Sequence, residues 1–442
     1  MEILSFLPLE QIKYFVLQAL KIVLNLWWAW VPFFLWPNVK RLYLFFKQVS
    51  WDRKKIKRIV LEIRIPKEVV KPIRAMELVF TGIWQIWAPP NPRERWLDGE
   101  FQLSISFEIA SIDGIPHFYI RTPTSLRSVL ESHIYSQYPE AEIFEVDDYT
   151  KKVPQDIPNK DWDLFGTGYK FTKPNAYPIR TYTEFESEQE EEEKRVDPLS
   201  HLLEGMSSLK PGEQLWVQIV AKPLLNDHTE LINGKTWQQI GEGERDRLVK
   251  RTKKEQPLNP AWKEAYQILK TGEPSKLKEE IKELLPPEMK MSPGEKDIVA
   301  ALEKKIGKLA FSCIVRYIYL GKREVFFKPN NRLGMSYFTE FNTQNLNTLR
   351  PDALTLTKVK TIKWWFLDAR RRFVRQRKLF RQYITRNYHN FPKIPASGDF
   401  IILNTEELAT IYHFPGHTVA PASTMERIEA KKSEPPADLP IE

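Results

Sequence analysis

Few residues of this chain have both the type and the spacing that metal binding or nucleotide hydrolysis requires. His413 and His417 lie four residues apart, as zinc ligands on a helix would, but the Pro-Gly pair between them breaks that helix. The GKT sequence at 234–236 matches the end of a phosphate-binding P-loop, yet Thr229 stands where the loop needs its first glycine. The sequence therefore predicts neither a zinc protease nor a P-loop hydrolase.

The single cysteine is no better a candidate for chemistry. Cys313 stands in a segment of alternating apolar residues, which is typical of a buried strand position. One thiol can form neither a disulfide framework nor a cysteine-based zinc cluster, and no GxSxG nucleophile motif occurs. We therefore predict a protein with no catalytic, cofactor-binding or metal-binding residues. An enzyme with an unrecognised site is the alternative.

Basic residues are the remaining candidates, and they are concentrated in two segments. The chain of 442 residues has a net charge of +9, with 66 basic and 57 acidic residues. Eight basic residues face one acidic residue in 40–58, and eleven face one in 358–386, so these segments carry +7 and +10. Residues 1–39 sum to zero, so the rest of the chain carries 9 − 17 = −8. Such concentration indicates contact with a membrane surface, a nucleic acid or an acidic partner.

The first 39 residues are the strongest indication of a membrane. No charged residue occurs from Ile22 to Val39, a run of about 27 Å as a helix, close to the thickness of a bilayer core. We predict a membrane-spanning helix in 1–39; a helix lying in the interface, a buried soluble helix and a cleaved signal peptide are the alternatives. The aromatic side chains predicted to anchor it are Trp27, Trp28, Trp30, Phe33, Phe34 and Trp36.

The basic segment 40–58 would then be a juxtamembrane linker. Its positive charge places the following residues on the cytoplasmic side, so we predict that the bulk of the chain lies at the inner face of the cytoplasmic membrane. Anionic headgroups would attract its side chains at about 1 kcal/mol each. The predicted headgroup contacts are Lys40, Arg41, Lys47, Arg53, Lys54 and Lys55.

The rest of the chain has the alternating strand and helix patterns of an α+β protein. Residues 59–149 follow the order βαββαβ, which predicts a first ferredoxin-like domain. A second α+β unit of this type is predicted over 150–350, where the alternating strands at 215–221 and 309–319 have the character of a hairpin pair. A long helical insertion at 223–305 would interrupt that pair.

The C-terminal part contains a long basic amphipathic helix within a predicted segment 351–425, followed by a proline-rich tail at 426–442. An apolar stripe recurs every three or four residues from 362 to 383, with Gln376 as its polar exception. The stripe predicts docking on the protein's own core. The basic faces predict contact with lipid headgroups or nucleic acid through residues that include Arg370, Arg371, Arg372 and Arg375.

Two stretches resemble a known family. The segments HFYIRTPTSLRSVLESHIYSQYPEAEIFEV at 117–146 and FIILNTEELATIYHFPG at 400–416, with EPPADLP at 434–440, resemble the membrane-linked N-terminal region of bacterial conjugation-type (type IV secretion, HerA/FtsK-related) ATPases. In that family a P-loop ATPase domain follows, and this sequence ends at the corresponding point, so the resemblance implies no ATPase activity here. Asn404 and Thr405 look like a helix cap, a structural role.

Together these observations predict a non-catalytic, membrane-anchored accessory or scaffold protein of a type IV secretion or conjugation-like translocation system. Its partner would be a P-loop ATPase docked at the cytoplasmic membrane face. The alternative is a nucleic-acid-binding protein that contacts DNA or RNA through the basic helix at 358–388. A homo-oligomer is compatible with both hypotheses.

Overall fold

The structure is a computed structural model, and its described residues form two compact units. The described residues are 13–15, 17–18, 21, 25, 27–66, 71–187, 197–226, 232, 234–249, 291–361, 365–386 and 400–415. The first unit comprises the described residues of Met1–Lys57 and Pro89–Gln102. The second comprises those of Arg58–Ala88, Leu103–Tyr388 and Pro395–Glu442.

The first unit is one long helix with a short segment packed along it. Helix α2 (Trp27–Lys55) contacts the single π-helical turn η2 (Glu94–Asp98). The hydroxyl of Tyr43 donates to the carbonyl of Trp96 at 3.2 Å, and the Lys47 ammonium donates to the carbonyl of Leu97 at 3.0 Å. Gly99 has φ +82°, and a Cβ there would lie 2.5 Å from the backbone of Lys47, so glycine allows this close approach.

The predicted membrane-spanning helix is wrong. Among the residues that the structure describes, no helix combines the length and the apolar character that a bilayer crossing needs. Only thirteen residues of α2, 27–39, precede the first charged residue, whereas a span takes about 20. The helix continues through Lys40 and Arg41 to three basic residues in its last turn, and it contains Pro32 and Pro37. Residues 22–24 and 26 of the apolar run lie outside the described residues.

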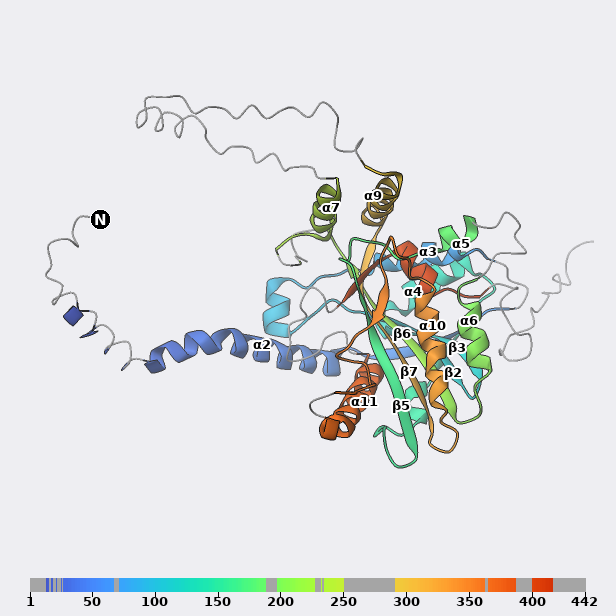
Figure 1. The fold of residues 1–442 in the computed structure, drawn as a ribbon, viewed down its shortest axis with the longest axis horizontal. Coiled ribbons are helices and arrows are strands. Elements are labelled where there is room, and N and C mark those ends of the chain that lie inside the picture. Colours follow the sequence, from blue (N-terminus) through green and yellow to red (C-terminus); the bar gives the residue numbers. More distant parts are fainter. Residues whose placement is uncertain are drawn as a thin grey trace, which may run out of the picture. The chain divides into compact units, whose positions relative to one another are not determined.

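The second unit is built on one antiparallel sheet, in which the described residues form nine strands (Figure 1). Its path is β4-β1-β3-β2-β6-β7-β5-β8, and β9 pairs with β7 beside this path. The strands are β1 (Arg58–Arg64), β2 (Ile105–Ile112), β3 (Ile115–Pro123), β4 (Glu142–Val146), β5 (Trp162–Phe171), β6 (Glu213–Leu224), β7 (Ala310–Lys322), β8 (Leu349–Pro351) and β9 (Ile401–Asn404).

The prediction of two separate ferredoxin-like units is therefore also wrong. Each half of the sheet has its own four strands, β4-β1-β3-β2 and β8-β5-β7-β6, but their edge strands pair with each other. Strands β2 and β6 run antiparallel from the pair Ile105–Ala221 to the pair Ile112–Gln214. An exposed edge presents unpaired backbone donors and acceptors, so joining two edges satisfies both. The predicted pairing of the strands at 215–221 and 309–319 is confirmed, since β6 pairs with β7 along its whole length.

Five helices cover one face of this sheet and bury the larger core against it. Apolar side chains such as Phe80, Ile134, Leu203, Phe338 and Leu408, one from each helix, share a cluster with the inward residues of the strands. Burial of such side chains stabilises the fold by about 1.5–3 kcal/mol each. The helices are α3 (Ile73–Trp84), α4 (Arg127–Gln137), α6 (Ser200–Ser207), α10 (Asn331–Thr339) and α12 (Thr405–Ile411).

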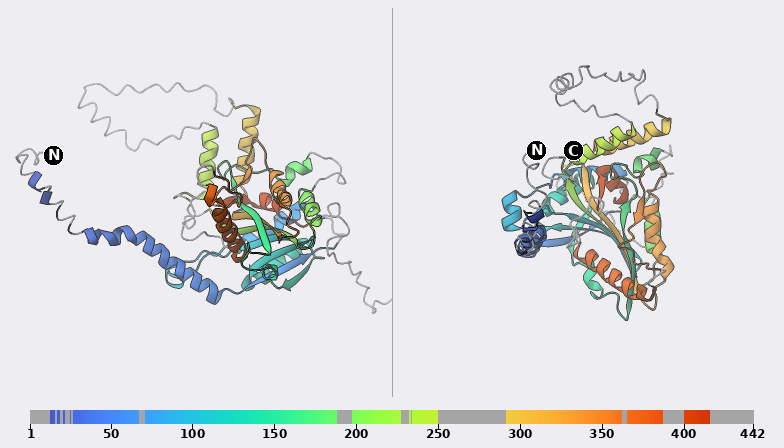
Figure 2. Two further views of the ribbon diagram at one scale, coloured as in Figure 1. Left: turned by 60° about the horizontal axis from the view of Figure 1, so that its bottom comes forward. Right: turned by 60° about the vertical axis from the view of Figure 1, so that its left-hand side comes forward.

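Helix α11 (Asp368–Thr385) lies on the opposite face. Figures 1 and 2 show it across the sheet from α6 and α10. Leu379, Phe380 and Tyr383 pack with Trp216 and Ile318 of the central strands in a second, smaller core. The helix begins at Asp368, after the 3-10 turn η8 (Trp365–Leu367), so it is shorter than the predicted segment.

The predicted insertion contains a pair of helices, α7 (Trp237–Leu248) and α9 (Pro293–Ile306), which contact each other. Both begin with a capping box, at Thr236 and Ser292. They pack with β9 in a third apolar cluster that includes Trp237, Leu302 and Ile402. Residues 250–290 of the insertion and the proline-rich tail lie outside the described residues. A further short helix, α5, spans Tyr182–Ser187.

Candidate anion-binding site

Helix α11 carries four exposed basic side chains, Arg370, Arg372, Lys378 and Arg381, and its own buried residues fix it to the sheet. Gln376 takes the central buried position, which explains why a polar residue interrupts the apolar stripe. Its amide nitrogen donates to the carboxylate of Asp163 at 3.0 Å and to the carbonyl of Leu164. Arg and Lys are good helix formers, so the solvent-facing positions support the helix while carrying charge.

A buried arginine fixes the C-terminal end of α11. Arg386 has φ +50°, a left-handed conformation that ends the helix, and its guanidinium turns inward. It donates two hydrogen bonds to Glu108, at 2.9 and 3.0 Å, and two to Asp148, at 2.5 and 3.0 Å. Paired donors matched to a carboxylate give both strength and a fixed geometry. The end of α11 is therefore held in one position over β2.

The carboxylate of Glu108 is the centre of this network. It also accepts hydrogen bonds from Ser106, Tyr149 and Gln218. Burial alone would raise the pKa of Glu108, but the charge and hydrogen bonds of Arg386 outweigh it and hold this pKa below its usual value. Burial likewise opposes the charge of Arg386, yet Glu108 raises the pKa of that guanidinium well above normal. The pair is therefore charged and structural.

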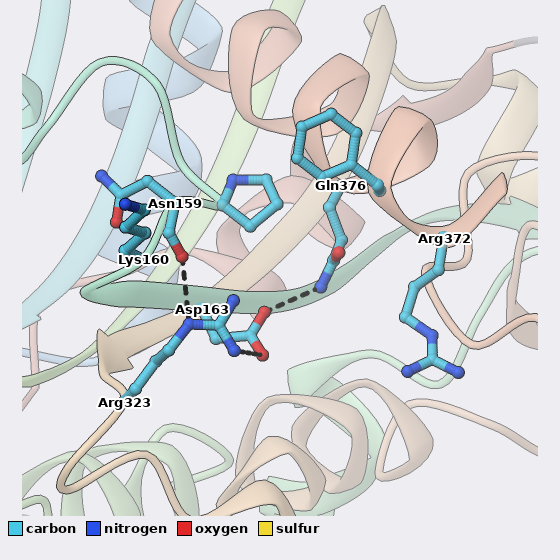
Figure 3. Close-up of a pocket in the computed structure, with 8 residues that line it drawn as sticks. Asn159, Lys160, Asp163, Arg323, Arg372 and Gln376 are labelled. Atoms are coloured by element: carbon cyan, nitrogen blue, oxygen red, sulfur yellow. Dashed lines mark hydrogen bonds and ion pairs between the residues drawn. The ribbon is translucent and has the colours of Figure 1, made fainter. Parts of the chain in front are cut away.

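An open cleft of about 530 Å³ lies beside α11, at the outer end of the β5–β7 pair (Figure 3). Its charged lining consists of Lys160, Asp163, Arg323 and Arg372, a sum of three positive charges and one negative charge. The remaining lining residues are neutral: Pro158, Asn159, Phe373 and Gln376.

The pairing of β5 with β7 brings these residues together. Trp162 is opposite Lys322, so the turn before β5 meets the turn after β7. Arg323 donates to the carbonyl of Asn159 at 3.0 Å, and its guanidinium lies 3.4 Å from the carboxylate of Asp163. The same carboxylate accepts from Gln376, which ties the turns to α11 (Figure 3).

Two cations of the cleft are not neutralised in this way. Lys160 and Arg372 are exposed, and neither forms a hydrogen bond or an ion pair with any other described residue. In Figure 3 Arg372 extends from α11 away from the cluster around Asp163. Guanidinium and ammonium groups of this kind are the usual partners of phosphate oxygens. The cleft can therefore accept an anion without breaking an existing ion pair.

The four arginines predicted on α11 have different surroundings. Arg370 and Arg372 are exposed and Arg371 is half-buried. Arg375 instead donates to the carbonyls of Ala353 and Leu356, at 2.9 and 3.0 Å. Arg375 therefore holds the preceding loop, whereas Arg370 and Arg372 face solvent.

The predicted contact residues of α2 are also divided. Lys47 bonds to η2, and the Lys40 ammonium lies 4.6 Å from the centre of the Trp96 ring. The side chains of Phe34 and Trp36 are exposed, as are those of Arg41, Arg53, Lys54 and Lys55. Nothing is described for the side chains of four further predicted anchors, Trp27, Trp28, Trp30 and Phe33.

The NTEELA segment is structural rather than chemical. The predicted cap is confirmed, because Asn404 caps α12 in a capping box with Glu407. Glu407 is buried and paired at 3.1 Å with the equally buried Lys305 of α9. Glu406 accepts from Thr181 and pairs with Lys304 and Lys308. These contacts join β9 and α12 to the insertion helix α9.

The histidine and cysteine candidates also have structural surroundings. The buried ring of His413 lies 2.9 Å from both the carboxylate of Asp197 and the carbonyl of Ala409, whereas His417 lies outside the described residues. Cys313 is fully buried on β7, and burial raises the pKa of its thiol. Within the described ranges, no group of three or more His, Cys, Asp or Glu side chains is arranged to hold a metal ion.

Lys160, Asp163 and Arg323 were not predicted from the sequence. The only local signal was their position in polar turns that flank alternating strands, and a turn alone does not indicate a site. The fold and the site thus define an α+β protein with a cleft, lined by three basic residues and one acidic residue, beside a basic helix. No protein-family model matches the chain, and no curated protein matches it either.

Proposed function

We propose that this protein binds nucleic acid through the exposed face of α11 and the adjoining cleft. The observation that carries this proposal is that two exposed basic side chains, Arg372 of α11 and Lys160, line the same cleft, with the exposed Arg370 on the same helix. Lys and Arg side chains supply the phosphate contacts that dominate the affinity of such complexes. The rigid attachment of α11 through Gln376 and Arg386 supports the proposal, since fixed cations lose less freedom on binding.

Anisotropy titration of a labelled oligonucleotide tests this function. We expect the variant with Arg370, Arg371 and Arg372 all changed to Gln to bind at least about tenfold more weakly at moderate salt, since the phosphate contacts of Arg370 and Arg372 are removed. The matched control changes Lys235, Lys296 and Arg332 to Gln, which removes the same charge from exposed positions outside α11. Equal weakening by both variants would show a general charge effect and would reject the proposed interface.

A second candidate function, a scaffold at a lipid surface, is favoured by a separate observation on α2. Leu35, Val39, Leu42 and Phe46 follow a four-three-four spacing and are all exposed. Arg41 on the same helix and the basic residues of its last turn complement anionic headgroups. We propose that this apolar stripe lies in the plane of the inner surface of the cytoplasmic membrane. The body would there dock a P-loop ATPase of a secretion or conjugation-like system, as the family resemblance implies.

Flotation with vesicles tests the lipid proposal. We expect the protein to float with phosphatidylglycerol-containing vesicles, and the variant with Leu42 and Phe46 changed to Ser to remain at the bottom of the gradient. The control is Leu354→Ser, which removes an exposed apolar side chain from the second unit. Unchanged flotation of the stripe variant would contradict the proposal.

A further inference from the structure

The two halves of the apolar stripe of α11 have opposite surroundings. In the C-terminal half, Phe380 and Tyr383 are fully buried on the sheet. In the N-terminal half, Phe373 is 43% exposed, and Phe366 and Trp365 in the preceding turn are 59% and 73% exposed. The same spacing of apolar residues thus gives a C-terminal half that packs on the sheet and an N-terminal half whose aromatic rings are exposed.

The exposed rings alternate along the chain with the exposed cations. Arg370, Arg371 and Arg372 lie between Phe366 and Phe373, and Phe373 and Arg372 both line the cleft. Arg377 lies over the Phe373 ring at 5.2 Å, which fixes a cation beside that ring. Phe373 and Arg372 therefore share the surface of the cleft, and the other exposed rings and arginines lie within the same nine residues from Trp365 to Phe373.

The combination of exposed rings and cations fits single-stranded nucleic acid better than a duplex. In a duplex the bases are stacked on each other and offer only their edges, so a flat aromatic ring has no base face to contact. In a single strand every base has an accessible face, and base–aromatic stacking combined with a basic groove is the usual mode of recognition. Rings beside arginines also suit an anionic lipid surface, so vesicle binding is one of the outcomes that the test distinguishes.

We infer that the segment Trp365–Phe373, with the cleft beside it, binds single-stranded nucleic acid. The rings of Trp365 and Phe373 stack on unpaired bases, and Arg370, Arg372 and Lys160 contact phosphates of the same strand. This inference rests on the proposed nucleic-acid function and specifies its substrate class.

The test compares a labelled single-stranded oligonucleotide with the duplex of the same sequence, using the full chain. We expect tighter binding of the single strand. We expect Trp365→Ala and Phe373→Ala each to weaken single-strand binding by at least about fivefold while leaving the salt dependence and duplex binding unchanged. Trp365→Tyr should restore most of the affinity, because it restores a stacking ring. The control is Phe327→Ala, an exposed ring outside α11.

The outcomes distinguish failure of the proposed nucleic-acid function from failure of the single-strand inference. Loss of all salt-dependent binding to either oligonucleotide would overturn the proposed function and this inference together. Salt-dependent binding in which the duplex binds as tightly as the single strand, or in which Trp365→Ala and Phe373→Ala have no effect, would leave the proposed function intact and overturn the inference. Vesicle binding that is lost in Trp365→Ala, without oligonucleotide binding, would assign the segment to lipid and overturn both.

Discussion

The charged residues of this protein work in two opposite ways, and the two ends of α11 show both. Arg386, just after the helix, is buried and bonded to Glu108 and Asp148. Arg370 and Arg372, near its start, are exposed and form no ion pair within the described structure. The comparison shows that a basic helix cannot be interpreted from its composition. The function of each arginine depends on whether the fold supplies its counter-charge.

The largest effect is expected where the buried end is disrupted. Arg386→Ala leaves Glu108 as a buried carboxylate without its cation, and loss of one partner of a buried pair costs about 3–5 kcal/mol. We expect the free energy of unfolding in urea to fall by that amount. A decrease of less than about 1 kcal/mol in the free energy of unfolding would show that the network around Arg386 does not hold α11.

The buried carboxylate of α12 gives a smaller effect that depends on pH. Burial opposes the charge of Glu406, but hydrogen bonds from Lys308, Thr181 and Lys304 lower its pKa from 4.5 to about 2. A lowered pKa stabilises the folded state above the unfolded pKa, and this stabilisation disappears as pH falls from about 4.5 to about 2. The shift corresponds to about 3 kcal/mol as an upper figure.

Urea unfolding between pH 2 and pH 6 measures this contribution. We expect the stability of Glu406→Gln to depend less steeply on pH below about 4.5 than that of the unaltered protein. The control is Glu142→Gln, at an exposed position of β4. Identical pH profiles for all three proteins would contradict the role assigned to Glu406.

The smallest effect on stability is expected at the exposed end of α11. Changing Arg370, Arg371 and Arg372 to Gln removes surface cations and no buried contact, so the free energy of unfolding should change by less than about 0.5 kcal/mol. The same variant should lose oligonucleotide affinity, as described above. Destabilisation comparable to that of Arg386→Ala would remove the contrast between the two ends.

Sequence patterns predicted the local elements well and their neighbours less well. The alternation of apolar residues in β6 and β7 indicated both strands. Their pairing was also predictable, because they are consecutive strands of the chain once the insertion between them is set aside. The pairing of β2 with β6 was not predictable, since an edge strand has the same alternation whether or not another strand covers it. The predicted span in 1–39 rested on an uncharged run of eighteen residues, 22–39, of which α2 contains thirteen, and four of the other five lie outside the described residues.

The candidate site was predictable only in part, for a similar reason. The arginines of α11 were evident from their density, but the cleft needs Asn159 and Arg323, which are 164 residues apart and meet only through the register of β5 and β7. Periodicity also predicted that the whole stripe of α11 would dock. It could not show which part of the stripe packs on the sheet, and the structure leaves Phe373 exposed and Phe380 buried.

The central claim is that the exposed arginines of α11 neutralise phosphates, and its most direct test is the salt dependence of binding. The slope of log K against log salt concentration counts the phosphates neutralised, at about 0.7 per contact for a single strand. We predict that changing Arg370, Arg371 and Arg372 to Gln lowers the magnitude of this slope by about 1.4, the share of the two contacts made by Arg370 and Arg372. A slope equal to that of the unaltered protein would contradict the account.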